Sequence, residues 1–346
     1  SNFSTFQRDK LSDRIIDISN YQNNTYSKVL FTNAGADANE SAIYLTREYF
    51  NLNNVKDKFR TLAFSKSFHG GSTIAASHIS GDIRCDIKKD FYQMPLEPIM
   101  PNPNFDDHGN SSLSGIENIL QSGNVASILI EGTSGSAGCI LYPNNYLSKL
   151  KLLCEKYNTL MICDEVMSGW GRTGTLFAHH QQNIEPDIIT TAKAITSGYA
   201  QLGAVIVNHK VADIFNDNPV MTGLTYSGHV LPCSVANSCL DLYLDQNLKI
   251  FSNVNDKAEY IKQKANQLVN NFDFVNEYRH NGMLGCLELN LNCDQKLNQI
   301  SNLLLKHGVF CMRIRKNIFI APPLTIEYPD ILYGFEKINQ AFIEFE

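Results

Sequence analysis

The chain has 346 residues, of which 43% are hydrophobic, and a formal net charge of -6. This length favours two domains with a sizeable buried core. The acidic balance, with no run of basic residues, argues against a nucleic-acid partner or an anionic membrane surface. No stretch is apolar over the length that a bilayer requires, and the first residues lack the pattern of a signal peptide.

Nine cysteines are scattered along the chain without a CxxC pair, and several stand inside apolar runs. This distribution is typical of reduced, buried thiols, whereas disulfide frameworks and zinc sites need paired spacings. We therefore expect a cytoplasmic protein without a metal site.

The first predicted strand and helix follow an irregular lead-in over residues 1–28. Residues 29–31 (VLF) read as a strand, a turn with Gly35 and Ala36 follows, and residues 37–50 have helical spacing. A glycine turn that opens a helix can bind a phosphate, because the first helical turn has free N–H groups and a favourable dipole. An ordinary strand-to-helix connection fits the same pattern.

The next predicted strand, residues 61–64, leads into a short glycine-containing loop that carries Phe68 and His69. The glycines permit a close approach of the backbone, and Phe68 offers a flat apolar face beside them. A core phenylalanine next to a flexible turn is the alternative interpretation.

Further apolar runs predict strands at residues 126–131, 160–163, 187–192 and 202–207, with a helix over residues 146–157. Strands that alternate with helices indicate a mostly parallel sheet covered on both faces. Ligands bind at the carboxyl ends of such strands. Three of the runs end on Glu131, Asp164 and Lys193.

Asp164 and Lys193 are the two groups that pyridoxal phosphate requires of a protein. The lysine forms a Schiff base with the cofactor, and the acid keeps the pyridine nitrogen protonated. A lysine after a strand is more often a solvated surface residue, so the pair by itself is weak evidence. The GxGxxG pattern at residues 169–174 suggests a dinucleotide instead, but no clear helix pattern opens at Gly174 and no acid stands about 20 positions further on at the end of a second strand.

The character of the chain changes near residue 250. Residues 255–272 predict a charged helix, residues 283–289 a strand and residues 296–307 a helix, and we expect a pair of strands on either side of Ala321-Pro322-Pro323. The sequence therefore predicts an α/β cofactor-binding domain over residues 1–249 and a smaller α+β domain over residues 250–346.

Seven motifs occur in an order and spacing that resemble one enzyme family. They are FTNAGADAN at residues 31–39, FHG at 68–70, EGTSGSAG at 131–138, ICDEVMSGWGRTG at 162–174, DIITTAK at 187–193, GLTYSGH at 223–229 and APPL at 321–324. Together they resemble the class III, or omega-amino-acid, aminotransferases, which belong to the fold type I enzymes that use pyridoxal phosphate.

The resemblance implies roles for particular residues around the cofactor. Lys193 would form the Schiff base and Asp164 would pair with the pyridine nitrogen, as the catalytic groups. The remaining implied cofactor contacts are Val166 and Phe68 on the two faces of the ring, His69 beside Phe68, the backbone N–H groups of Gly35 and Ala36 at the phosphate, and Glu131 near Asp164 or the substrate. Thr225 would reach the phosphate in the neighbouring subunit, which implies a homodimer with shared active sites.

The C-terminal arginine that binds a substrate carboxylate in many members best matches Arg313, with Arg315 as the alternative. Ala36 and Asp37 stand where the family usually has Ser and Glu, which removes a hydroxyl contact to the phosphate and keeps the backbone contacts. The family's N-terminal segment has no counterpart before Ser1.

The function that the resemblance implies is amino transfer from an amine or an omega-amino acid to a 2-oxo acid such as pyruvate. The GLTYSGH motif favours donors such as taurine, beta-alanine or 4-aminobutyrate. Racemisation, an aminomutase shift and decarboxylation use the same lysine, so they are alternatives within the fold. A non-catalytic paralogue with a binding or structural role is the alternative outside enzyme chemistry.

Overall fold

The computed structural model describes residues 4–20, 23–81, 85 and 100–346. The chain forms two units: the first comprises Ser1–Gly132, Tyr142–Trp170 and Phe177–Asp245, and the second comprises Thr133–Leu141, Gly171–Leu176 and Gln246–Glu346. The second unit therefore includes two short earlier segments that the predicted boundary near residue 250 left in the large domain.

The first unit contains a mixed, mostly parallel sheet. Its strands are β1 (Tyr26–Thr32), β2 (Arg60–Ala63), β3 (Val125–Glu131), β4 (Leu160–Asp164), β5 (Ile188–Thr191) and β6 (Gly203–Asn208), in the order β1-β6-β5-β4-β3-β2. Strands β2 to β5 run parallel, and β6 is antiparallel to both of its neighbours, β5 and β1. The predicted α/β fold class and the six predicted strands are confirmed.

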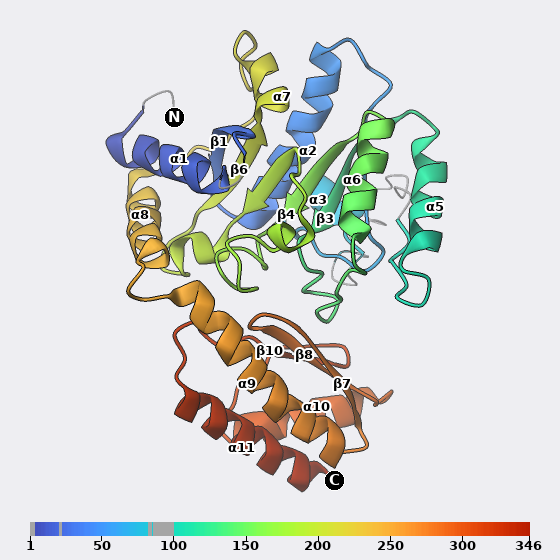
Figure 1. Ribbon diagram of the computed structural model, residues 1–346, viewed down its shortest axis with the longest axis vertical. Coiled ribbons are helices and arrows are strands. Elements are labelled where there is room, and N and C mark those ends of the chain that lie inside the picture. The colour runs from blue at the N-terminus through green and yellow to red at the C-terminus, as the bar shows by residue number, and fades with distance from the viewer. Residues whose placement is uncertain (1–3, 21–22, 82–84, 86–99) are drawn as a thin grey trace. The chain divides into compact units, whose positions relative to one another are not determined.

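Helices cover both faces of this sheet (Figure 1). One face packs against α2 (Gly35–Leu52), α3 (Ile74–Ile79) and α7 (His209–Ala212), and the other against α5 (Asn110–Leu120) and α6 (Tyr146–Lys156). Residues along β4 alternate between the two cores: Ile162 joins the α2 side, and Cys163 joins the α5 and α6 side. Because side chains two apart share a face, Asp164 projects toward α2.

Two more helices of the first unit, α1 (Phe6–Ser19) and α8 (Val230–Leu244), are joined by side-chain contacts. The Arg14 guanidinium forms an ion pair with Asp241 at 2.8 Å and donates to the carbonyl oxygen of Asn237 at 2.8 Å. The N-terminal lead-in over residues 1–28, predicted to be irregular, therefore contains a packed helix over half of its length.

The second unit contains an antiparallel sheet of β7 (Val275–Asn281), β8 (Leu284–Leu289), β10 (Asn317–Ile320) and β9 (Arg313–Ile314), in that order. Its core is shared with α9 (Ile250–Asn271), α10 (Asp294–Lys306) and α11 (Tyr328–Phe345). Strand β7 has no counterpart in the prediction, because this edge strand is mostly polar and only half-buried.

The strand pair predicted on either side of Ala321-Pro322-Pro323 is wrong. Both β9 and β10 precede Ala321, and the chain after Pro323 continues into α11. Ile331, Phe335, Ile338 and Phe342 of this helix are buried at helical spacing. Burying that stripe in the core of the second unit favours a helix over a strand.

Nine free cysteines are present, seven of them buried, as expected for reduced thiols. Among the described residues, no helix combines the length and apolar character needed to span a bilayer. The cytoplasmic location expected from the cysteines remains a prediction.

Candidate active site

Three polar residues form a row at the carboxyl edge of the sheet. Glu131 ends β3 and pairs in register with Asp164 at the end of β4, which pairs in turn with Thr190 of β5. All three are buried. Neighbours in a parallel register face the same way, so the row lies on the side covered by α2.

The Asp164 carboxylate has three hydrogen-bond donors within the protein. Oδ2 accepts from the Asn39 amide at 2.7 Å and pairs with His69 Nδ1 at 2.9 Å, and Oδ1 accepts from the Val166 backbone N–H at 2.9 Å. The His69 ring is fully buried. These contacts bring the predicted residues Asp164, His69 and Val166 together.

Asn39 of α2 and Thr190 of β5 join this cluster without having been predicted. The Asn39 amide also donates to the carbonyl oxygen of His69 at 2.7 Å, and the Thr190 hydroxyl donates to the amide oxygen of Asn39 at 2.5 Å. The sequence position of Asn39 could have indicated its role, because it stands one helical turn after Gly35 on the same face of α2. Thr190 belongs to the row defined by the strand register.

The start of α2 has the features of a phosphate site. Its N-cap, Ala34, makes no side-chain bond to the first turn, so the capping position does not compete for the N–H groups of Gly35 and Ala36. A Cβ at Gly35 would lie 2.7 Å from Val166 Cγ1, and one at Gly70 would lie 2.7 Å from the Cβ of Ala36. The two glycines thus let the β4 end and the loop after β2 approach the helix start closely.

Lys193 lies two residues beyond the end of β5, after Ala192, and is the first residue of a short 3-10 helix, η2 (Lys193–Thr196). Its side chain is exposed and its φ is 47°, a strained value for a non-glycine residue. The backbone on either side is anchored: the Trp170 indole donates to the Thr191 hydroxyl at 2.6 Å, and the Tyr243 hydroxyl donates to the carbonyl of Ala194 at 2.8 Å. Among the described residues, none pairs with the Lys193 amine.

The carboxylate of Glu165, the neighbour of Asp164, does not join the cluster around Asp164. It accepts from the Ser168 hydroxyl at 2.5 Å, from the backbone N–H groups of Ala178 and His179, and pairs with His179 Nδ1 at 2.8 Å. Burial raises the pKa of Glu165, but the bonds from His179 and Ser168 outweigh it and the net pKa is lowered. Cys163, Glu165 and His179 bring metal-type ligand atoms within 4.8 Å of one another, but the Glu165 oxygens are committed to these donors.

Phe68 and Thr225 lie in loops of the first unit. The half-buried Phe68 ring would be in van der Waals contact, at 3.7 Å, with a Cβ placed on Gly71. Thr225 is exposed in the segment before α8, where Met221 and Tyr226 are also exposed, as is Leu231 in the first turn of α8.

The two candidate arginines are in the second unit and differ in their contacts. The Arg313 guanidinium donates to the Ser301 hydroxyl at 2.9 Å, to Asn298 Oδ1 at 2.6 Å and to the carbonyl of Arg315 at 2.5 Å. Arg315 is exposed with a φ of 53°, and in the described part of the chain no group bonds to its guanidinium.

Comparison with known proteins assigns the chain to a family. The model of the class-III aminotransferases matches residues 1–342. The chain belongs to this family.

Relatives of this class-III aminotransferase differ in their substrates. The chain is 30% identical over 338 residues to a succinylornithine transaminase from Photorhabdus laumondii, which covers 97% of this chain and 79% of that protein. It is 31% identical over 317 residues to an acetylornithine/succinyldiaminopimelate aminotransferase from Buchnera aphidicola, covering 91% and 74%. A solved taurine:2-oxoglutarate aminotransferase from Bifidobacterium kashiwanohense, in complex with pyridoxal phosphate and glutamate, superimposes with a TM-score of 0.90 at 30% identity, covering 99% and 80%.

Class-III aminotransferases depend on pyridoxal phosphate, so this aminotransferase is a pyridoxal-phosphate enzyme. The residues present fit that cofactor. The start of α2 offers N–H groups to the phosphate, the anchored Asp164 carboxylate suits a protonated ring nitrogen, and Lys193 presents an amine.

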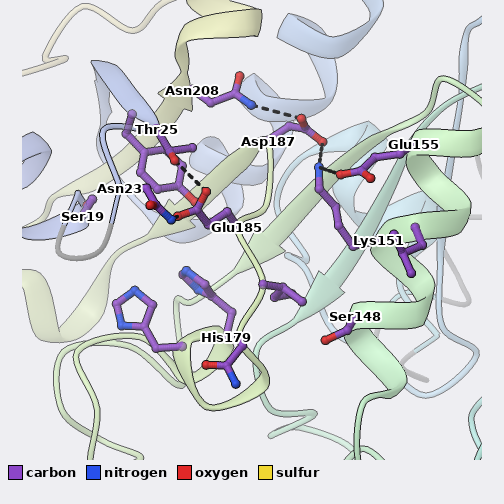
Figure 2. Close-up of a pocket in the computed structure, with 15 residues that line it drawn as sticks. Ser19, Asn23, Thr25, Ser148, Lys151, Glu155, His179, Glu185, Asp187 and Asn208 are labelled. Atoms are coloured by element: carbon purple, nitrogen blue, oxygen red, sulfur yellow. Dashed lines mark hydrogen bonds and ion pairs between the residues drawn. The ribbon is translucent and has the colours of Figure 1, made fainter.

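A cavity of about 610 Å³ in the first unit of the aminotransferase lies away from this cluster, at the amino-terminal ends of β1 and β5 (Figure 2). Its acidic groups already have partners: Asp187 forms an ion pair with Lys151 at 2.8 Å and accepts from the Asn208 amide at 3.1 Å, and Glu185 accepts from the Thr25 hydroxyl at 2.7 Å. The residues that fit the cofactor lie instead at the opposite, carboxyl edge of the sheet, where Asp164 ends β4 and Lys193 lies just beyond the end of the neighbouring strand β5.

Proposed function

We propose that this aminotransferase moves an amino group from an amine or omega-amino acid to a 2-oxo acid, with Lys193 as the covalent anchor of the cofactor. The supporting observation is the exposed Lys193 amine at the end of β5, the strand beside the one that ends on the anchored Asp164. The backbone of Lys193 is strained, and the neighbouring residues Thr191 and Ala194 are held by bonds from Trp170 and Tyr243.

Pyridoxal phosphate supplies an aldehyde that accepts the amino group and a ring that withdraws electrons from the carbon that loses its proton. We propose that the Lys193 amine would hold this cofactor and, when free, would accept that proton and donate it to the neighbouring carbon. The Asp164 carboxylate holds the ring nitrogen protonated, which strengthens the withdrawal of electrons. The N–H groups of Gly35 and Ala36 hold the phosphate.

Replacing Lys193 by Ala tests this proposal. We expect amino transfer to fall by about a thousandfold or more, because the variant loses both the anchor and the proton carrier. The rate is measured with the purified protein, and the visible absorption of the bound cofactor shows whether the linkage forms. Lys210→Ala, at an exposed position of α7, is the matched control and should retain activity. Full activity in Lys193→Ala would refute the assignment.

The donor is proposed to carry a carboxylate or sulfonate far from its amine, like the taurine in the name of one relative and the ornithine derivatives in two others. Of the two arginines, we propose Arg315 as the group that binds this anion, since Arg313 already bonds to three acceptors. The donor and the acceptor are identified by measuring the rate of amino transfer for several candidates. The donors are taurine, beta-alanine, 4-aminobutyrate and acetylornithine, each tested with pyruvate or 2-oxoglutarate. Arg315→Gln should raise KM for the anionic donors and leave a simple alkylamine unaffected; an equal KM for both would exclude Arg315.

A further inference from the structure

We propose that Asn39 and Thr190 are positioning residues that hold the Asp164 carboxylate in the orientation it needs to receive the cofactor's ring nitrogen. This inference rests on the role proposed above for Asp164. Asn39, Thr190 and Asp164 are 1%, 0% and 4% exposed, so each of their polar atoms depends on a partner within the protein.

The Asn39 amide can stand in only one orientation. Its Nδ2 faces Asp164 Oδ2 and the carbonyl oxygen of His69, and its Oδ1 faces the Thr190 hydroxyl. A carboxylate and a carbonyl only accept hydrogen bonds, so both N–H bonds of the amide must point at them. Reversing the amide would set its oxygen against two acceptors.

The Thr190 hydroxyl locks that orientation from the other end. It lies 2.5 Å from Asn39 Oδ1, and Thr190 is in register with Asp164 on the neighbouring strand. The hydroxyl therefore connects β5 to α2, and the amide connects α2 to the end of β4. Asp164 is therefore held by the Asn39 amide, whose own orientation is fixed by the Thr190 hydroxyl.

Three donors already occupy the Asp164 carboxylate, namely Asn39, His69 and the Val166 N–H. A carboxylate offers about four acceptor positions, so about one remains. The three donors decide where that position points. If Asn39 lost its fixed orientation, the remaining position would no longer be defined, and the ring nitrogen would find a poorer acceptor.

Thr190→Val tests the proposal, because it keeps the shape of the side chain and removes the hydroxyl. We expect the dissociation constant of the protein for pyridoxal phosphate to rise about tenfold, and Thr190→Ser to restore it. Thr61→Val is the matched control: Thr61 is an equally buried threonine of the same sheet whose hydroxyl bonds to Ser127 at 2.8 Å, outside the Asp164 cluster. It should bind the cofactor as the wild type does.

A second ligand separates positioning from a general loss of structure. An analogue of pyridoxal phosphate with carbon in place of the ring nitrogen offers Asp164 no hydrogen-bond donor. The wild type and Thr190→Val should therefore bind this analogue equally. A variant that binds both ligands more weakly by the same factor, or one that binds pyridoxal phosphate as the wild type does, would overturn the inference. A wild-type protein that binds no pyridoxal phosphate would instead contradict the proposed function itself.

Discussion

Asp164 and Glu165 show how two adjacent acids acquire different roles. Asp164 faces α2 and accepts from Asn39 and His69, whereas Glu165 accepts from Ser168 and His179. The division arises because Asp164 is the last residue of β4, where its side chain takes the α2 face, and Glu165 begins the turn that follows. Glu165 is thus a structural anchor for the segment around Ala178.

Glu165→Gln should destabilise the protein in a pH-dependent manner. The native pKa of Glu165 lies below its ordinary value of 4.5, so its stabilisation is complete above pH 4.5 and is lost as the pH falls through the lower native value. We expect the variant to lose about 2–4 kcal/mol of unfolding free energy at pH 7. Urea denaturation between pH 7 and pH 3.5 should show this difference shrinking below pH 4.5.

Glu259→Gln, at an exposed position of α9, is the control for that titration and should change the unfolding free energy by less than about 1 kcal/mol. A loss in Glu165→Gln that stays constant down to pH 3.5 would contradict the assigned role, because it would show that the charge of Glu165 is irrelevant.

Helix α2 is the element on which the site depends most. Its first turn presents the N–H groups of Gly35 and Ala36, and one turn later Asn39 reaches Asp164. Gly35 allows Val166 to pack against the helix start, since a Cβ there would lie 2.7 Å from Val166 Cγ1. In the proposed site, the position of α2 against the end of β4 would therefore serve the phosphate end and the ring end of the cofactor together.

Gly35→Ala should push Val166 away and weaken both stability and cofactor binding. Overpacking of this kind costs about 1–3 kcal/mol, and we expect cofactor affinity to fall severalfold in a binding titration. Gly334→Ala in α11 is the matched control, because nothing lies within 4 Å of a Cβ placed there; it should be neutral or stabilising by about 1 kcal/mol. Equal behaviour of the two variants would argue against a tight contact at Gly35.

At the scale of the whole molecule, we propose a homodimer with shared active sites. Met221, Tyr226 and Leu231 are 73%, 66% and 62% exposed around Thr225, and exposed apolar side chains gathered in one segment are typical of an interface. The symmetric arrangement would place Thr225 of each chain at the phosphate held by its partner.

Mixing two inactive variants tests this arrangement. If Thr225 acts across the interface, a heterodimer of Lys193→Ala and Thr225→Ala chains contains one site with both changes and one intact site, so activity should return on mixing. If Thr225 serves its own chain, each site of the heterodimer carries one change and no activity returns. Light scattering of the wild type should give the mass of a dimer, and an active monomer would refute the proposal.

Much of the fold and part of the site follow from local sequence signals. Apolar runs with turn signals located all six strands of the first unit, and acids or amines at their ends pointed to Asp164 and Lys193. The signals failed where a segment depends on its neighbours: β7 is a polar edge strand stabilised by pairing with β8, and α11 is a helix because its apolar stripe fills the second core.

The sequence by itself determined the alternation of strands and helices and the chemical groups at the strand ends, because these depend on spacing within a few residues. Only the tertiary structure decided that Asn39, His69, Asp164 and Thr190 form one hydrogen-bonded cluster, and that Glu165 does not join it. Strand register and the packing of α2 on the sheet bring these residues together over separations of 30 to 151 positions. No local pattern encodes contacts across such distances.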